Sequence, residues 1–228
     1  MKSQPFAFGA PPLGRRPPLI ERLAAGVALA LLSPALLAIA VAIVLESGRP
    51  ALFRQTRVGL CGSLFQICKF RSMRQGSTGS AITAARDSRT TRVGAVLRRF
   101  KLDELPQLWN VVRGEMRFVG PRPELPKFVD LQNSAWQRVL SASPGITDLA
   151  TLLYRNEEAV LRDSANVEER YANTVLPDKL RFSLTYLEIR NWRTDLKLIG
   201  LTLLASFVPW TFSEPKVLRS LSLPGKAT

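Results

Sequence analysis

An unbroken apolar segment dominates the first quarter of the chain. Residues 23–45 contain no charged side chain, and this length exceeds the roughly 20 residues that a membrane-spanning helix needs. Ser33 and Pro34 lie near the midpoint of the segment. A proline removes a backbone donor and clashes with the preceding turn, so it kinks or breaks a helix. The pattern therefore predicts a membrane helix that is interrupted at Ser33 and Pro34.

Two membrane geometries fit this segment: a kinked helix that crosses the bilayer, and a hairpin that enters and leaves by the same face. Each half spans about 20 Å at about 1.5 Å per residue, which is shorter than the roughly 30 Å hydrocarbon core. The positive-inside tendency places both flanks on the cytoplasmic side, because arginines lie at both ends. These are Arg15, Arg16 and Arg22 before the segment, and Arg49, Arg54 and Arg57 after it. We therefore expect residues 19–46 to form a re-entrant helix–break–helix hairpin, with a simple signal anchor as the alternative.

Shorter patterns follow downstream. Apolar and polar residues alternate over 51–73 around Gly59 and Gly62, which predicts two strands joined by a turn. Helical spacing of apolar residues recurs in four segments, at 93–100, 105–113, 128–141 and 157–171. Together these segments predict an α/β fold that is mainly helical and contains a small β element.

A second apolar segment, residues 196–212, lies near the carboxyl end and is interrupted by Lys197. It is too short and too polar for a second span, so it predicts an amphipathic helix that lies in the bilayer interface. Trp192 and Trp210 would then lie among the lipid head groups. The alternative is an ordinary core helix.

Composition limits the partners and the chemistry. The 228 residues include 32 Lys+Arg against 18 Asp+Glu, a formal net charge of +14, so anionic partners are expected: nucleic acid, acidic lipid or phosphorylated small molecules. No histidine is present, which excludes the usual catalytic triads and most zinc sites. Cys61 and Cys68 match no common metal motif and are predicted to be free thiols. Acid–base or metal chemistry must therefore use carboxylates, lysine or tyrosine.

Asp103 and Glu104 are the strongest candidates for that chemistry. Two carboxylates at a helix start can converge on one Mg²⁺, which takes hard oxygen ligands and substrate phosphates, and a carboxylate can attack phosphorus. Alone, the pair is weak support, because Asp103 could cap the helix at 105–113 while Glu104 points into solvent. The context favours catalysis, because cationic residues surround the pair in the sequence. Among them are Arg98, Lys101, Arg113, Arg117 and Arg122.

Two cationic side chains have further support. Arg122 stands between Pro121 and Pro123, which lowers the entropy cost of presenting its planar fork to a phosphate. Lys69 alternates with aromatic neighbours on the second predicted strand. A solvated surface is the ordinary place for a single basic residue, so their assignment to a site depends on the wider motif pattern.

Five motifs in a fixed order supply that pattern. They are FRQTRVG at 53–59, KFRSM at 69–73, DSRTTRVG at 87–94, LDELPQLWN at 102–110 and VGPRP at 119–123. This order resembles the bacterial sugar transferases. More narrowly, it resembles the small monotopic phosphoglycosyl transferases that prime glycan assembly on undecaprenyl phosphate. The resemblance extends from about residue 19 to about residue 204.

The resemblance implies a membrane helix broken at a Ser-Pro pair, here Ser33 and Pro34, beside a cytoplasm-facing domain. It implies that Asp103 is the nucleophile and that Glu104 assists it, both as ligands of a required Mg²⁺. By position, three side chains match family residues around the phosphates, and a fourth falls near an arginine of the family's Gly-Arg-Asn segment. The three are Lys69, Arg98 and Arg122, and the fourth is Arg155.

These expectations divide the chain into four parts: a flexible basic arm at 1–18, the re-entrant hairpin at 19–46, a cytoplasmic catalytic domain with interfacial helices at 47–212, and a flexible tail at 213–228. We expect transfer of a sugar-1-phosphate from a UDP-sugar to undecaprenyl phosphate, through a covalent phosphosugar on Asp103 and with release of UMP. Mg²⁺ is the expected cofactor. The expected location is the cytoplasmic face of the bacterial inner membrane. The sequence does not decide whether the protein forms a homodimer.

The rival hypothesis is a non-catalytic, membrane-tethered basic protein that binds acidic lipid or nucleic acid. The sequence contains no motif that recognises nucleic-acid bases, and its Lys and Arg residues are spread along the chain. We therefore expect no nucleic-acid partner. A polytopic transferase of the same reaction class would need many spans, whereas this sequence shows one. Residues 148–153 (DLATLL) depart from the family, which often continues with Gly-Trp or Gly-Leu there, so the sugar itself is not predicted.

Overall fold

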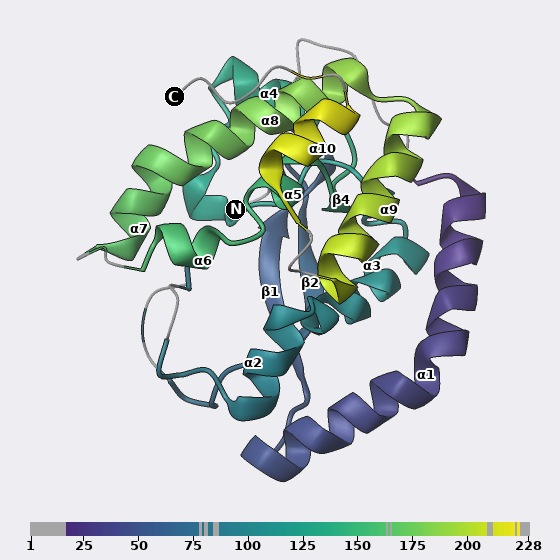
Figure 1. Ribbon diagram of the computed structural model, residues 1–228, viewed down its shortest axis with the longest axis vertical. Coiled ribbons are helices and arrows are strands. Elements are labelled where there is room, and N and C mark those ends of the chain that lie inside the picture. The colour runs from purple at the N-terminus through teal and green to yellow at the C-terminus, as the bar shows by residue number, and fades with distance from the viewer. Residues whose placement is uncertain are drawn as a thin grey trace, which may run out of the picture.

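The structure is a computed structural model, and it describes residues 17–77, 79, 82–83, 87–162, 164, 166–208, 212–221 and 223. The basic arm expected at 1–18 therefore lies almost entirely outside the described residues, and so does Trp210. Helices form most of the described chain, beside two small two-stranded sheets (Figure 1). The prediction of a mainly helical fold with a small β element is confirmed.

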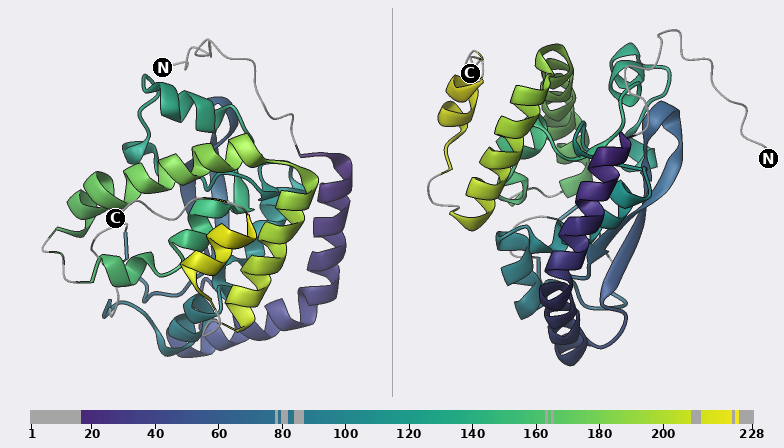
Figure 2. Two further views of the ribbon diagram at one scale, coloured as in Figure 1. Left: turned by 45° about the horizontal axis from the view of Figure 1, so that its top comes forward. Right: turned by 90° about the vertical axis from the view of Figure 1, so that its right-hand side faces the viewer.

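The long apolar segment forms one helix, α1 (Leu19–Ser47), which bends sharply and runs along one side of the molecule (Figures 1 and 2). Pro34 lies inside α1 and cannot donate to the carbonyl oxygen of Ala30, four residues earlier. The Ser33 hydroxyl donates to that oxygen instead, at 2.7 Å. The interruption expected at Ser33 and Pro34 is thus a bend within a continuous helix.

Both halves of α1 lie against the same domain. Among the described residues, α1 is the one helix long and apolar enough to cross a membrane, and many of its large apolar side chains are exposed. In the first half, Ala25 packs beside Leu108, and in the second half Ile43 packs beside Leu97. A long apolar helix at the expected place is confirmed. The re-entrant path through a bilayer stays a prediction.

Two charged side chains join the end of α1 to the domain. Glu46 accepts hydrogen bonds from the first two backbone N–H groups of α2 (Arg92–Arg99), at 2.7 and 2.9 Å. Arg71 donates to the carbonyl oxygen of Ser47 at 3.0 Å. A negative charge at a helix amino end and a positive charge at a carboxyl end both complement the helix dipole.

The predicted pair of strands is confirmed. β1 (Leu52–Val58) and β2 (Leu64–Phe70) form an antiparallel hairpin, joined through the short 3₁₀ turn η1 (Leu60–Gly62). Cys61 is exposed and Cys68 is buried, and both are free thiols as expected.

A second sheet joins β3 (Arg117–Val119) to β4 (Gly145–Thr147) in parallel. The sequence does not predict it, because strands of three residues are too short to show alternation. The two chains approach closely at Gly120 and Gly145: a Cβ on Gly145 would lie 2.1 Å from the Gly120 nitrogen. Glycine is therefore required at this contact, which holds the segment after β3 in place.

The other helical elements complete the domain. They are η2 (Leu102–Gln107), α3 (Leu108–Val112), η3 (Pro126–Phe128), α4 (Ser134–Leu140), α5 (Leu149–Leu153), α6 (Glu157–Val160), α7 (Val167–Arg170), η4 (Tyr171–Val175), α8 (Leu176–Ile189), α9 (Trp192–Phe207) and α10 (Glu214–Ser220). Three of them differ from the expected bounds. The segment at 105–113 begins earlier, at Leu102; the one at 128–141 begins only after the capping residue Asn133; and the one at 157–171 is divided into α6, α7 and η4.

The segment expected to be a flexible tail, 213–228, contains the helix α10 in its first half. Val217 and Leu218 are 2% and 5% exposed and pack in the same cluster as Leu149. A proline in the first turn favours the start of a helix, but seven residues are too few to show helical periodicity. Tertiary packing therefore orders a segment whose local pattern is weak.

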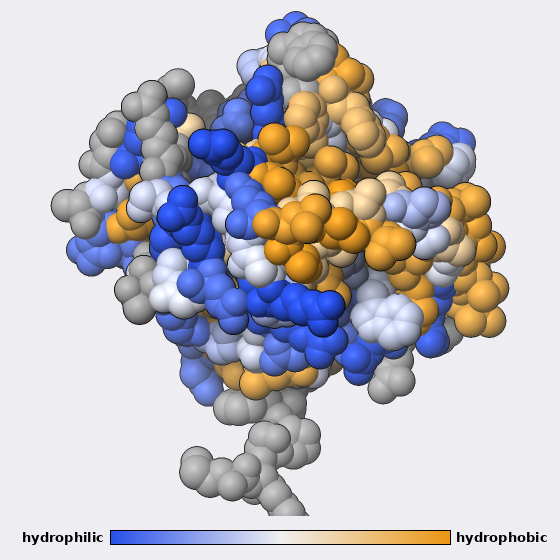
Figure 3. Space-filling view, turned by 90° about the horizontal axis from the view of Figure 1, so that it is seen from below, coloured by the Kyte–Doolittle hydropathy of each residue, from blue (hydrophilic) through white to orange (hydrophobic). Residues whose placement is uncertain are grey.

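Helix α9 covers most of the segment at 196–212, and it has one buried side and one exposed apolar side. One side packs on the domain through Leu198 and Ala205, which are 0% and 2% exposed. The exposed apolar residues of α9 are Trp192, Leu196, Leu203, Leu204 and Phe207. Seen from below, apolar side chains gather over one side of the molecule and hydrophilic ones over the other (Figure 3). Contact of α9 with a bilayer surface stays a prediction.

Candidate active site

The two adjacent carboxylates lie where α2 ends and the chain changes direction. Lys101 adopts a left-handed conformation with φ 56°, so α2 stops and η2 begins with Asp103 and Glu104 in its first turn. Asp103 is 9% exposed, and the Glu104 side chain is 11% exposed. The alternative of a helix cap beside a solvated glutamate is therefore wrong, because Lys101 occupies the cap position and Glu104 does not face solvent.

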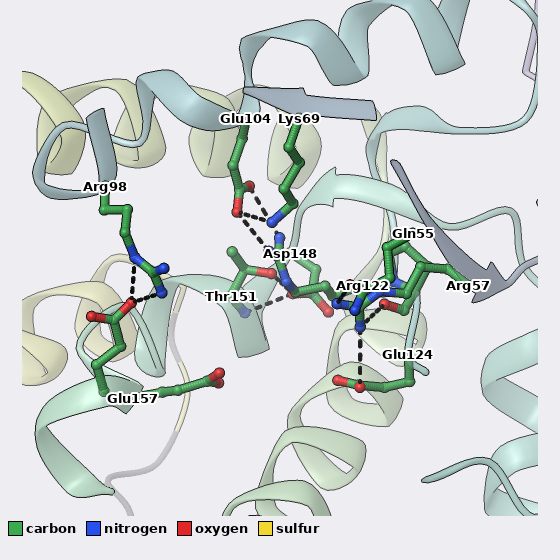
Figure 4. Close-up of polar contacts among 12 residues, drawn as sticks. Gln55, Arg57, Lys69, Arg98, Glu104, Arg122, Glu124, Asp148, Thr151 and Glu157 are labelled. Carbon is green, nitrogen blue, oxygen red and sulfur yellow. Dashed lines mark hydrogen bonds and ion pairs between the residues drawn. The ribbon is translucent and has the colours of Figure 1, made fainter. Parts of the chain in front are cut away.

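Glu104 is held by two of the cations that the sequence singled out (Figure 4). Its Oε1 accepts hydrogen bonds from Lys69 Nζ at 2.9 Å and from Arg122 Nη2 at 2.6 Å, and its Oε2 accepts one from Arg122 Nη1 at 3.1 Å. Burial would raise the pKa of Glu104, but Arg122 and Lys69 outweigh it and hold that pKa well below its usual value. Glu104 is therefore ionised at neutral pH, at a point where three distant motifs meet.

Asp103 has a different environment. Its Oδ1 is buried and has no hydrogen-bond partner among the described residues. Burial and the charge of Glu104 raise the pKa of Asp103, while Lys69 and Lys101 oppose that rise. A buried carboxylate oxygen without a partner is rare in folded proteins and calls for an explanation, such as a catalytic role or a bound ion.

Arg98 and Arg155 lie near this centre but do not bind either acid. Arg98 donates through Nε and Nη2 to Oε1 of Glu158, at 3.1 and 2.5 Å. Arg155 donates to the carbonyl oxygen of Arg99 at 3.1 Å. The structure thus brings Lys69, Glu104 and Arg122 together, and it places these two arginines on another part of the site.

A cavity of about 440 Å³ connects these parts. Its charged lining includes Lys101, Glu104, Arg122, Arg155 and Glu158. Its apolar lining includes Ala28 and Leu32 of α1, and Ile199, Leu203 and Phe207 of α9. Asp103, which is buried, does not contribute to the lining. The cavity therefore has a charged part beside the acid pair and an apolar wall formed by α1 and α9.

A second buried network adjoins Arg122. Lys179 Nζ lies 2.9 Å from Glu157 Oε2 and 3.4 Å from Glu124 Oε1. The Tyr171 hydroxyl donates to Glu124 Oε1 at 2.6 Å, and Arg57 Nη1 lies 3.6 Å from Glu124 Oε2. This network connects the turn after Arg122 to helices α6 and α8.

This network is not predicted from the sequence, although the sequence carries two signals for it. Glu124 follows directly after the VGPRP motif. Lys179 precedes Phe182 and Tyr186 by three and seven residues, so it lies on the buried face of α8. A lysine on an apolar face needs a buried partner, and Glu124 is such a partner.

Asp103 and Glu104 offer carboxylate oxygens, the type of ligand that Mg²⁺ prefers. The part of the chain that the structure describes contains no cluster of three or more His, Cys, Asp or Glu suited to a metal ion. A carboxylate offers about four lone-pair sites, and Glu104 uses three of them. One site on Glu104 Oε2 and the unpartnered Oδ1 of Asp103 remain. That set fits Mg²⁺, which is commonly held by one or two carboxylates plus water and substrate phosphates.

A long apolar helix with exposed side chains thus lies beside a cavity that is apolar along α1 and α9 and charged around Glu104 and Arg122. The chain belongs to the bacterial sugar transferase family, because the sequence model of that family matches residues 17–209. The resemblance predicted from the five motifs is confirmed.

Three relatives carry descriptive names. A UDP-glucose:undecaprenyl-phosphate glucose-1-phosphate transferase of Caulobacter vibrioides is 46% identical over 137 residues, covering 58% of this chain and 51% of the relative. A UDP-N-acetylgalactosamine-undecaprenyl-phosphate N-acetylgalactosaminephosphotransferase of Aeromonas hydrophila is 51% identical over 113 residues, covering 49% and 27%. A glucose-1-phosphate transferase of Escherichia coli K12, named like the first, is 37% identical over 192 residues, covering 79% and 38%.

The chain thus spans about half or less of these curated relatives. Their names describe phosphotransfer to undecaprenyl phosphate and differ in the sugar. None of these names supports the rival hypothesis of a non-catalytic basic protein.

Proposed function

We propose that this chain transfers a sugar-1-phosphate from a UDP-sugar to undecaprenyl phosphate in two steps, through a covalent phosphosugar on Asp103. One observation supports this best: the two adjacent acids have opposite environments. Glu104 is bound by Lys69 and Arg122, whereas Oδ1 of Asp103 has no partner in the described part of the chain. Glu104 can therefore organise the cations, and Asp103 keeps an oxygen for reaction. The names of the relatives support the two substrates.

In the first step, an ionised oxygen of Asp103 attacks the phosphorus that carries the sugar. The bond from that phosphorus to the bridging oxygen breaks, and UMP leaves with the electron pair. Arg122 and Lys69 offset negative charge on the phosphates, with Arg155 further along the cavity and Arg98 bound to Glu158 of its lining. Such electrostatic stabilisation is usually the largest contribution in phosphoryl transfer. Lys69, Lys101 and Arg98 also favour the ionised form of Asp103.

In the second step, a phosphate oxygen of undecaprenyl phosphate attacks the same phosphorus. The bond between phosphorus and Asp103 breaks, the carboxylate is restored, and undecaprenyl diphosphate-sugar is formed. The apolar wall of the cavity, with Leu32 from α1 and Leu203 and Phe207 from α9, suits the polyprenyl chain. The cationic end suits its phosphate.

Mg²⁺ would be held by Asp103 and Glu104 together with water and phosphate oxygens, and when bound it would add positive charge beside the phosphates. The chain itself keeps Asp103 apart from bulk water and orients Arg122 through Glu104. We place the domain at the cytoplasmic face of the inner membrane, with α1 re-entrant, because arginines flank both ends of that helix. The product would begin the assembly of a polysaccharide or another glycan.

The test uses the purified full chain with undecaprenyl phosphate, Mg²⁺ and a panel of UDP-sugars. We expect UMP and a lipid-linked sugar diphosphate with one or a few of the donors. Without the lipid, we expect about one UMP per enzyme and a protein mass increased by one sugar phosphate. Asp103→Asn should abolish both, whereas Asp130→Asn, an exposed aspartate of a turn, should not.

Two results would reject the proposal. Appreciable turnover by Asp103→Asn would exclude Asp103 as the nucleophile. If no UDP-sugar gives Mg²⁺-dependent UMP release, the chain would be a binding protein rather than a transferase.

A further inference from the structure

One lysine binds two glutamates that follow the arginines of the cavity. Arg122 precedes Glu124 by two residues, and Arg155 precedes Glu157 by two residues. Lys179 on α8 lies 3.4 Å from Glu124 and 2.9 Å from Glu157. The two arginine-bearing turns are distant in sequence, so Lys179 is a direct connection between them.

This connection is buried. The side chains of Lys179 and Glu124 are 8% and 6% exposed. Lys179 also donates to the Tyr171 hydroxyl at 3.0 Å, so several groups replace its lost water. Burial opposes the positive charge, but Glu157 and Glu124 outweigh it and hold the pKa of Lys179 well above its ordinary value. The lysine is therefore charged at neutral pH and is fixed between two carboxylates.

The network also reaches the cavity. Lys179, Glu157, Arg122 and Arg155 all contribute to its lining. In Figure 4, the side chains of Glu124 and Glu157 point toward each other from different elements, and Arg122 lies between Glu124 and the Glu104–Lys69 pair. A shift of Lys179 would therefore move both turns relative to each other.

We infer that Lys179 is a positioning residue: by binding Glu124 and Glu157, it fixes the separation of Arg122 and Arg155 across the cavity. This rests on the proposed function, in which those arginines bind the donor's phosphates. Positioned groups are sensitive to small shifts, and a misplacement of about 1 Å can cost on the order of 100-fold in rate. Lys179 acts through the arginines and does not itself react.

The first measurement is the affinity for UDP, by calorimetry on the full chain in detergent. Glu157→Gln keeps the shape of the side chain and removes one charge, and we expect UDP binding to weaken about tenfold, which corresponds to about 1.4 kcal/mol. Lys179→Met should weaken it more, and Lys179→Arg should restore part of the loss. Lys127→Met removes a lysine from a more exposed pair with Glu168 and should leave the affinity unchanged.

A double-mutant cycle separates positioning from a general structural role. If Glu157 acts through Arg155, the variant Arg155→Gln/Glu157→Gln should bind UDP no more weakly than Arg155→Gln alone. An additive loss would overturn the inference, and so would wild-type affinity in Glu157→Gln. Thermal unfolding identifies variants that do not fold. If Lys179→Met fails to fold, the Glu157 cycle decides alone.

The failure of this inference differs from the failure of the proposed function. UDP binding needs no turnover, so a chain that binds UDP but forms no UMP would reject the transferase reaction alone. Normal turnover by the Glu157→Gln variant would reject the role of Lys179 and would leave the transferase reaction standing. A wild-type chain without measurable affinity for UDP would overturn this inference, whereas UMP release from UDP-sugars would still decide the proposed function.

Discussion

The substitution Glu104→Gln tests whether the acid and its two cations form one buried charge cluster. The side chains of Glu104, Lys69 and Arg122 are only 11%, 17% and 20% exposed. Removing one partner of a buried ion pair costs about 3–5 kcal/mol, because the other charge stays buried without compensation. For a chain of this size, about 1 kcal/mol shifts the unfolding midpoint by about 2–4 °C. We therefore expect Tm to fall by about 6–20 °C in a thermal unfolding experiment.

The matched control is Glu168→Gln. Glu168 pairs with Lys127 at 2.5 Å, but the two side chains are 37% and 45% exposed. Exposed pairs contribute about 0–1 kcal/mol, so Tm should fall by about 4 °C or less. If Glu104→Gln loses no more than this control, Glu104 does not neutralise two buried cations and the argument for the cluster is refuted.

Three further predictions concern pH, metal and membrane geometry. Burial and Glu104 raise the pKa of Asp103, so the UMP burst should decline with falling pH at a pH above the usual pKa of aspartate. Lys101 opposes that rise, so Lys101→Met should move the decline to higher pH. An unchanged pH profile in Lys101→Met would contradict this account of Asp103. A chelator should abolish UMP release, and added Mg²⁺ should restore it; full activity in the chelator would exclude a metal requirement. Pro34→Ala restores a donor for the Ala30 carbonyl and should straighten α1, so cysteine labelling should find the two ends of α1 on opposite faces of a vesicle; labelling of both from one face would show that Pro34 does not determine the bend.

The elements that sequence predicted well have strong local patterns. Residues 19–47 form a long segment with an uncharged centre, and the alternation at 52–70 spans two full strands. The elements that it missed are α8, with 14 residues, and several short ones: β3, β4, α5 and α10 have three to seven residues. Such short elements exist because the rest of the chain packs against them, for example around Gly120 and Gly145, and local sequence carries little trace of that packing.

In the candidate site, too, some residues were grouped correctly from the sequence and other contacts were not predicted. The order of the motifs brought Lys69, Glu104 and Arg122 into one hypothesis, and the structure joins them by hydrogen bonds. Their roles in catalysis stay predictions. The pairing of Arg98 with Glu158 and of Lys179 with Glu124 is not predicted, because the partners lie about 55–60 residues apart in the chain and the tertiary fold brings them together.

The attachments at Glu46 and Arg71 have a mechanical consequence. Glu46 accepts hydrogen bonds from the start of α2, and Arg71 donates to the last turn of α1. These contacts restrict the movement of α1 relative to the domain. If α1 is embedded in the bilayer as proposed, these contacts fix the height of the acid pair above the lipid. The UDP-sugar from the aqueous side and undecaprenyl phosphate from the bilayer would then meet at one fixed height.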